Sequence, residues 1–230
     1  MAGQNIEELE KKIKIQFKDG ELLQTAVTHR SYLNENRSYK LDQNERLEFL
    51  GDAVLELVVT DYLYANFPNP EGELTNWRAS LVNKDMLARV SRSIGVEDFL
   101  LMSRGEAKDT GRAREYLLAN AMEAIIGAIY LDQGYESAKN FILENIVVNL
   151  KEVLESKSYL DPKSHFQEVA QDKEGVTPNY RVLSESGPDH NKKFVVGVYI
   201  GDEKIAEGEG CSKQEAQRNA AKAGLEAKDW

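Results

Sequence analysis

The stretch that decides the fold is NERLEFLGDAVL, residues 44–55 of the 230-residue chain. At helical spacing, Glu45, Glu48 and Asp52 fall at i, i+3 and i+7 and share one face. Beside that face runs an apolar stripe of Leu47, Leu50, Val54 and Val58. We therefore expect a buried helix whose converging carboxylates need a cation, because desolvating several charged acids together is costly. A hard divalent metal with oxygen ligands, such as Mg²⁺, meets that need.

A second helical segment, YLLANAMEAIIGAIY at residues 116–130, is more apolar still. Asn120 and Glu123 interrupt it at i, i+3. The segment also contains small residues that allow close approach of another helix, namely Ala119, Ala121, Ala124, Gly127 and Ala128. The pattern predicts that the two helices face each other and share one metal cluster.

Residues 45–55 closely resemble the signature of the ribonuclease III family of double-stranded-RNA endonucleases. Four further pieces are similar to the same family: THRSY at 28–32, EGEL at 71–74, the loop at 104–112, and the segment at 123–132. The resemblance spans nearly the whole chain. It implies the bacterial-type plan of one endonuclease domain and one double-stranded-RNA-binding domain.

The resemblance also implies the catalytic metal ligands, which are Glu48, Asp52, Asn120 and Glu123. Asn120 departs from the family pattern, which most often has Asp at this position. An amide oxygen can coordinate Mg²⁺, but it carries no charge and cannot act as a base, so weaker metal affinity is expected. The expected cofactor is Mg²⁺, with Mn²⁺ as a substitute, and no small-molecule cofactor is expected.

Two accessory acids, Glu45 and Glu71, match family positions associated with the catalytic valley. The alternative for Glu45 is an ordinary solvated carboxylate. For the ligand set, the alternative is a structural ion-pair network with Arg46 or Arg78, because such networks resemble active sites.

Composition is typical of an intracellular globular protein. The single cysteine, Cys211, excludes an internal disulfide, and residues 1–15 are too polar for a secretory signal or membrane span. We expect a cytoplasmic protein with no membrane association. The net charge of −10 and the pI near 5.0 are unusual for a protein that binds nucleic acid. An average charge nevertheless says little about a local basic stripe.

The chain is predicted to divide near residues 155–162, where helical periodicity stops and Pro162 can open a new helix. The first domain, residues 1–157, is predicted to be an all-α endonuclease domain. Its expected helices are 6–16, 21–28, 45–66, 72–82, 84–94, 115–131 and 135–154.

The second domain, residues 161–229, changes to helix, three strands and helix. The expected elements are a helix at 163–171, strands at 179–186, 193–200 and 204–208, and a helix at 212–227. In the second strand, Phe194, Val196, Val198 and Ile200 alternate onto one side. This small α+β order, αβββα, resembles a double-stranded-RNA-binding domain.

Duplex RNA offers such a domain shape, 2′-hydroxyls and phosphates to recognise. Three groups of residues match the family's RNA contacts: Ser164, Gln167 and Glu168 on the first helix; Pro188 and His190 in the first strand turn; and Ser212, Lys213 and Gln214 at the start of the last helix. The family usually has more lysines where Gln214 and Gln217 stand, so phosphate binding is expected to be weaker unless Arg218 and Lys222 compensate.

The family resemblance further implies a homodimer in which signature helices pair and Phe49 enters a pocket of the other subunit. Phe49 lies next to the acidic face rather than within the apolar stripe, which gives this role modest support. Its alternative is core packing.

The leading hypothesis is a Mg²⁺-dependent endoribonuclease that cuts both strands of duplex RNA, including rRNA and mRNA precursors, and leaves 5′-phosphate and 3′-hydroxyl ends. A second hypothesis is a double-stranded-RNA-binding protein with impaired or absent cleavage, because Asn120 removes a ligand charge. A third is a helical scaffold whose acids are structural.

Overall fold

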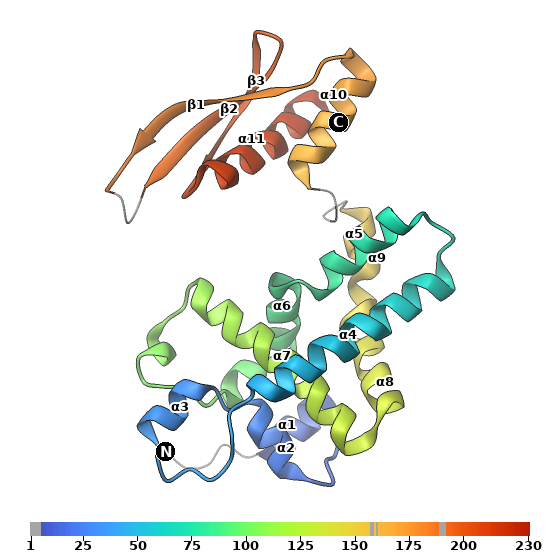
Figure 1. The fold of residues 1–230 in the computed structure, drawn as a ribbon, viewed down its shortest axis with the longest axis vertical. Helices are drawn as coiled ribbons and strands as arrows, with labels where there is room; N and C mark the ends of the chain where they lie inside the picture. Colours follow the sequence, from blue (N-terminus) through green and yellow to red (C-terminus); the bar gives the residue numbers. More distant parts are fainter. Residues whose placement is uncertain (1–5, 157–158, 160, 189–191) are drawn as a thin grey trace. The chain divides into compact units, whose positions relative to one another are not determined.

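The computed structural model describes residues 6–156, 159, 161–188 and 192–230 (Figure 1). Its contacts divide the chain into two compact units, Met1–Tyr159 and Leu160–Trp230. The first is helical and the second has the order αβββα, which confirms the predicted fold class. No helix in these described ranges is long and apolar enough to cross a membrane.

The helical unit begins with three short helices. These are α1 (Ile6–Ile13), α2 (Gly20–Ala26) and α3 (Arg30–Glu35). The side chain of Asp19 caps α2, and the ring of His29 caps α3 by accepting from Ser31 N. Helix α3 was not predicted from the sequence, since so short a helix shows no apolar repeat.

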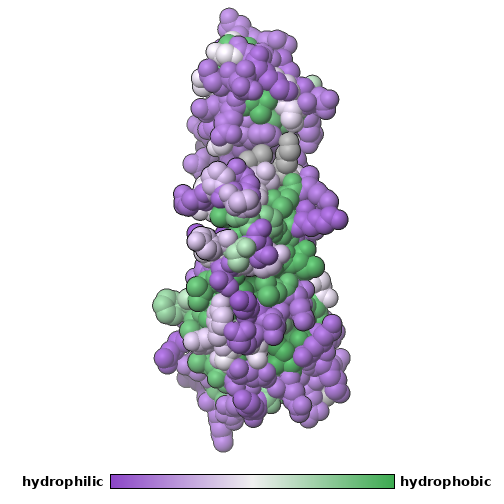
Figure 2. All heavy atoms as spheres, turned by 90° about the vertical axis from the view of Figure 1, so that its right-hand side faces the viewer, coloured by the Kyte–Doolittle hydropathy of each residue, from purple (hydrophilic) through white to green (hydrophobic). Residues whose placement is uncertain are grey.

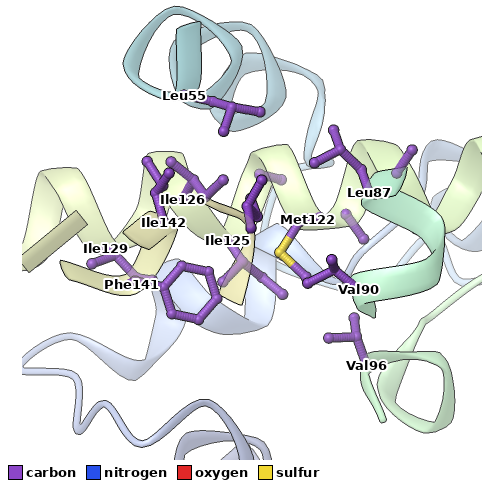
Figure 3. Packing of buried hydrophobic residues seen from close by; sticks show 14 of the residues in the cluster. Leu55, Leu87, Val90, Val96, Met122, Ile125, Ile126, Ile129, Phe141 and Ile142 are labelled. Atoms are coloured by element: carbon purple, nitrogen blue, oxygen red, sulfur yellow. The ribbon is translucent and has the colours of Figure 1, made fainter. Parts of the chain in front are cut away.

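Six further α-helices complete the described part of this unit. They are α4 (Glu45–Asn66), α5 (Glu71–Val82), α6 (Lys84–Ile94), α7 (Arg112–Gln133), α8 (Tyr135–Asn145) and α9 (Leu150–Glu155). Short 3₁₀ turns lie at Val96–Phe99, Glu106–Lys108 and Val147–Asn149. Figure 3 shows how Met122, Ile125 and Ile126 of α7 pack among side chains of the surrounding helices.

The single helix predicted over residues 135–154 is wrong, because the structure breaks it after Asn145. The amide of Asn145 donates to the carbonyl oxygen of Phe141 at 2.8 Å. The amide of Asn149 donates to the carbonyl oxygens of Asn145 and Ile146 at 3.0 and 2.9 Å. Such local side-chain bonds compete with the regular helical ladder.

The C-terminal unit consists of α10 (Pro162–Glu174), β1 (Asn179–Ser186), β2 (Lys193–Ile200), β3 (Glu203–Gly210) and α11 (Lys213–Lys228). The strands form an antiparallel sheet in the order β1-β2-β3, with Val196 opposite both Val182 and Gly208. Both helices lie on one face of the sheet (Figure 1). The predicted alternation in β2 is confirmed, since Phe194, Val196, Val198 and Ile200 are all buried.

Candidate functional site

Helices α4 and α7 cross at two glycines. A Cβ atom placed on Gly51 would lie 1.7 Å from the carbonyl oxygen of Glu123, and one on Gly127 would lie 2.3 Å from that of Leu47. The two backbones therefore touch, which only glycine permits. This contact brings the segment with Glu48 and Asp52 against the segment with Asn120 and Glu123, as the sequence predicts.

The carboxylates at this crossing influence one another. Burial, together with the nearby charges of Asp52 and Glu48, raises the pKa of Glu123 to about 7. The pKa of Glu48 is also raised, first by burial. The crossing thus holds negative charge in a partly desolvated place, where a bound cation is stabilising.

The expectation that all three acids of α4 are buried is wrong. Glu48 is half-buried, whereas Glu45 and Asp52 are exposed. Gly51 faces α7, and each further helical residue turns its side chain by about 100°, so Asp52 lies at the rim of the contact. The rim position leaves its carboxylate accessible from solvent.

Asn120 presents a buried side-chain oxygen to this site. Among the described residues, its Oδ1 has no hydrogen-bond partner. An unsatisfied buried oxygen is costly and calls for a bound water or ion. The orphaned oxygen therefore fits the ligand role that the family resemblance implies for Asn120, which stays a prediction.

The arrangement does not form a closed metal cage. Within the described ranges, no three His, Cys, Asp or Glu side chains are arranged to hold a metal ion. Mg²⁺ usually keeps several waters and takes only one or two carboxylates from the protein. The residues present fit that open mode, with the amide of Asn120 as a further oxygen donor.

The two accessory acids lie apart. Glu45 is exposed, accepts from Gln43 Nε2 at 3.0 Å and lies 3.6 Å from the Arg30 guanidinium. Glu71 starts α5, beyond the far end of α4, and lines a pocket of about 670 Å³ with Tyr64, Phe67 and other residues. Glu71 is therefore not brought to the α4–α7 crossing within one chain.

The structural ion-pair alternative gains no support from Arg78. Its guanidinium lies 3.0 Å from Glu56 and donates to Thr60 Oγ1 at 2.9 Å. In the described part of the chain, neither Arg46 nor Arg78 lies within ion-pair distance of Glu48, Asp52 or Glu123.

The THRSY motif forms hydrogen bonds with the loop before α7. The ring of His29 lies 2.9 Å from Ser31 Oγ and 3.0 Å from Glu106 Oε2, and Ser31 also bonds to Glu106. The backbone N–H of Ser103 donates to Ser31 Oγ at 2.9 Å. These contacts give His29 a structural role beside the acidic residues.

One residue near the crossing was missed by sequence reasoning. Lys84, the first residue of α6, lowers the pKa of both Glu48 and Glu123 through its charge. A single lysine after a helix cap carries no pattern that marks it, and only the packing of α6 against α7 shows its place.

In the C-terminal unit, the predicted RNA contacts on α10 are exposed. Ser164, Gln167 and Glu168 lie opposite the buried side chains of Phe166 and Ala170. Pro188 is also exposed, and His190 lies outside the described residues.

The start of α11 is exposed at Ser212, Lys213 and Gln214, the residues predicted to contact RNA there. The Ser212 hydroxyl caps the helix by accepting from Glu215 N at 3.1 Å, and Glu215 Oε2 accepts from the backbone N–H of Cys211, the residue before the cap, at 2.7 Å. Lys163 of α10 donates to Gln217 Oε1 of α11 at 2.8 Å, so the two helices share one polar surface.

Both units match families of known proteins. Residues 19–150 match the family model described as Ribonuclease-III-like, and residues 162–228 match the double-stranded RNA binding motif. Ribonuclease 3 of Enterococcus faecalis is 43% identical over 228 residues, covering 99% of each chain. Ribonuclease 3 of Borreliella afzelii is 43% identical over 216 residues, covering 94% of this chain and 88% of that one.

A solved structure is similar to the helical unit. The nuclease domain of ribonuclease III from Campylobacter jejuni is 46% identical, with a TM-score of 0.57, and covers 63% of this chain and 98% of its own. The chain belongs to the ribonuclease III family and carries a double-stranded RNA binding motif. The resemblance found in the sequence is confirmed, and the family indicates use of a divalent metal ion.

Proposed function

We propose that this protein is a Mg²⁺-dependent endoribonuclease that cuts both strands of double-stranded RNA. The α4–α7 crossing carries the proposal, because it gathers Glu48, Glu123 and the orphaned oxygen of Asn120 beside the exposed Asp52. The RNA-binding unit supports a duplex substrate. Products with 5′-phosphate and 3′-hydroxyl ends, a role on rRNA and mRNA precursors, and a cytoplasmic location complete the proposal.

In this mechanism the protein's side chains bind the metal ion and keep the site ordered. Glu48, Asp52, Asn120 and Glu123 would hold the divalent ion, which when bound supplies an activated water and stabilises charge on the phosphate. Mn²⁺ would substitute for Mg²⁺ at these oxygen ligands. His29 is held by Ser31 and Glu106, so it orders the neighbouring loop rather than moving a proton.

A homodimer through α4 belongs to the same proposal. Phe49, Leu57 and Tyr64 are 82%, 57% and 82% exposed, so core packing of Phe49 is excluded in this chain. At about 100° per residue, their side chains point within about 80° of one another, so they share one side of α4. Figure 2 shows hydrophobic side chains on the face that includes the end of α4 and the start of α5.

An antiparallel pairing of two α4 helices matches this surface. Centred near Leu57, it would set Phe49 against the partner subunit's Tyr64, where the pocket of about 670 Å³ opens. It would also bring Glu71 of the partner subunit toward this chain's Glu45, which explains why Glu71 lies far from the crossing in one chain.

Binding of duplex RNA with impaired or absent cleavage is the second candidate, and Asn120 is the observation that favours it. With Asn at position 120, the implied metal site has three charged ligands, whereas the family pattern has four. Loss of a ligand charge weakens metal affinity.

The deciding experiment is incubation of the purified protein with end-labelled duplex RNA, with Mg²⁺ or with chelator, reading cleavage and gel retention together. Metal-dependent cuts in both strands support the nuclease. Retention without cuts supports the second candidate, and absence of both contradicts both proposals.

The variant Asn120→Asp sharpens this test. Restoring the fourth charge is expected to tighten Mg²⁺ binding and to raise cleavage at limiting metal by about tenfold. Equal cleavage by both proteins at all metal concentrations would show that the amide is a sufficient ligand.

A further inference from the structure

Lys84 stands at a helix start beside the acidic crossing. Asn83 caps α6 by accepting from Met86 N at 2.9 Å, which fixes the backbone at Lys84. The Lys84 ammonium lies 4.2 Å from the centroid of the Tyr116 ring, within cation–π range. The ring therefore gives this long side chain a preferred position.

Tyr116 connects that position to the site. It precedes Asn120 by four residues and Glu123 by seven on α7, so the three side chains share one face of the helix. Helix α6 is itself bonded to α7, since Ser91 Oγ donates to the carbonyl oxygen of Leu118 at 2.8 Å. The Lys84 ammonium thus lies at one end of the face of α7 that carries Asn120 and Glu123.

The ammonium of Lys84 is available to a ligand. Lys84 is exposed, and among the described residues no carboxylate oxygen lies within 4.0 Å of its nitrogen. Its charge lowers the pKa of both Glu48 on α4 and Glu123 on α7, so the ammonium that rests over the Tyr116 ring is close enough to act on both acids. A phosphate entering an acidic site needs such a cation, because the carboxylates repel it.

We propose that Lys84 is a further catalytic residue, which binds a non-bridging oxygen of the RNA phosphate at the metal site, and that Tyr116 positions it. The inference rests on the proposed function, because it assumes that duplex RNA enters this site. Its charge offsets part of the repulsion between the three ligand carboxylates and the phosphate.

The first test uses binding rather than turnover. Duplex-RNA affinity is measured across a salt series in Ca²⁺, with gels confirming that the RNA stays intact. Lys84→Met is expected to lower the slope of log affinity against log salt by about one, as loss of one phosphate contact does. Lys84→Arg should keep the slope.

The matched control is Lys12→Met. Lys12 is another lysine over an aromatic ring, 5.9 Å from the centroid of Phe99, and it is not part of the crossing. Its slope should equal that of the unmodified protein. Tyr116→Phe should keep the slope and Tyr116→Leu should lower it, because only the latter removes the ring.

A second measurement separates phosphate binding from a structural role. Without RNA, Lys84→Met should bind Mg²⁺ several-fold more tightly, because a competing positive charge is gone. Cleavage at saturating Mg²⁺ should nevertheless fall at least tenfold, whereas a merely destabilised variant would lose both.

The outcomes distinguish the two proposals. An unmodified protein that binds duplex RNA with a steep salt slope, together with an unchanged slope in Lys84→Met, overturns the role of Lys84 alone. Failure of the unmodified protein to bind duplex RNA overturns the proposed function and this inference with it.

Discussion

The two units of this protein hold the side chains predicted to be functional in opposite ways. In the helical unit, Glu48 and Glu123 are fixed where two backbones touch at Gly51 and Gly127. In the C-terminal unit, Lys213 and Gln214 are exposed side chains on the first turn of α11. The first site is defined by packing and the second by surface charge, so substitutions should act through different physical effects.

This difference predicts unequal tolerance. A packed interior resists even one added methyl group, whereas exposed positions usually change stability by only a few tenths of a kcal/mol. Substitutions at the helix crossing should therefore cost more stability than substitutions on α11.

The largest effect is expected from Gly51→Ala. The new methyl group would overlap the carbonyl oxygen of Glu123, at 1.7 Å, so α4 and α7 must separate. Such overpacking is expected to cost about 3 kcal/mol and to weaken Mg²⁺ binding with it. Urea unfolding followed by Trp77 emission, in a Trp230→Phe background, isolates the helical unit.

Gly20→Ala is the control for Gly51→Ala. Gly20 lies at the start of α2 with no atom within 4 Å of an added Cβ. It should be neutral or slightly stabilising, as Ala replaces Gly in a helix. Equal midpoints for the two variants would show that the crossing is loose.

A smaller effect of opposite sign is expected from Glu123→Gln in the absence of metal. The folded-state pKa of Glu123 is raised from 4.5 to about 7, so the folded protein favours the protonated form. Its stability is full below pH 4.5 and falls as pH rises through 7. The shift corresponds to at most about 3 kcal/mol, which partial exposure reduces to about 2 kcal/mol.

Melting temperatures measured from pH 5 to pH 9 in chelator test this prediction. The metal-free Glu123→Gln variant should melt above the unmodified protein at pH 8, and the two should converge near pH 5. Mg²⁺ should stabilise the unmodified protein more than the variant, because the variant lacks one ligand charge. A variant that melts lower at every pH would instead support a structural scaffold.

The sequence predicted much of this contrast. The bounds of α4, α6, β1 and β2 were predicted to the residue, because apolar period and chain breaks are local signals. The ligand set that the resemblance implies stays a prediction, and the structure brings its two helices together at Gly51 and Gly127.

What escaped prediction depends on tertiary contacts. The exposure of Asp52 depends on which residue of α4 touches α7, and a helical repeat alone does not determine that. Lys84 reaches the site through the packing of α6, and the break after Asn145 arises from side-chain bonds to nearby carbonyl oxygens. A one-dimensional pattern contains none of these distances.

The smallest expected effect is a gain at the surface site, from Gln214→Lys. Gln214 is exposed on the first turn of α11, where the family resemblance leads us to expect lysine, so a new cation would meet phosphate without any repacking. Duplex-RNA affinity should rise about threefold at moderate salt and its salt slope should steepen by about one. Stability should fall by at most about 0.5 kcal/mol, because a cation opposes the positive end of the helix dipole.

The control for Gln214→Lys is Ala227→Lys, which adds the same charge at the other end of α11 and should leave the slope unchanged. Equal gains in both variants would mean that overall charge, rather than the position of the first turn, sets RNA binding in this unit.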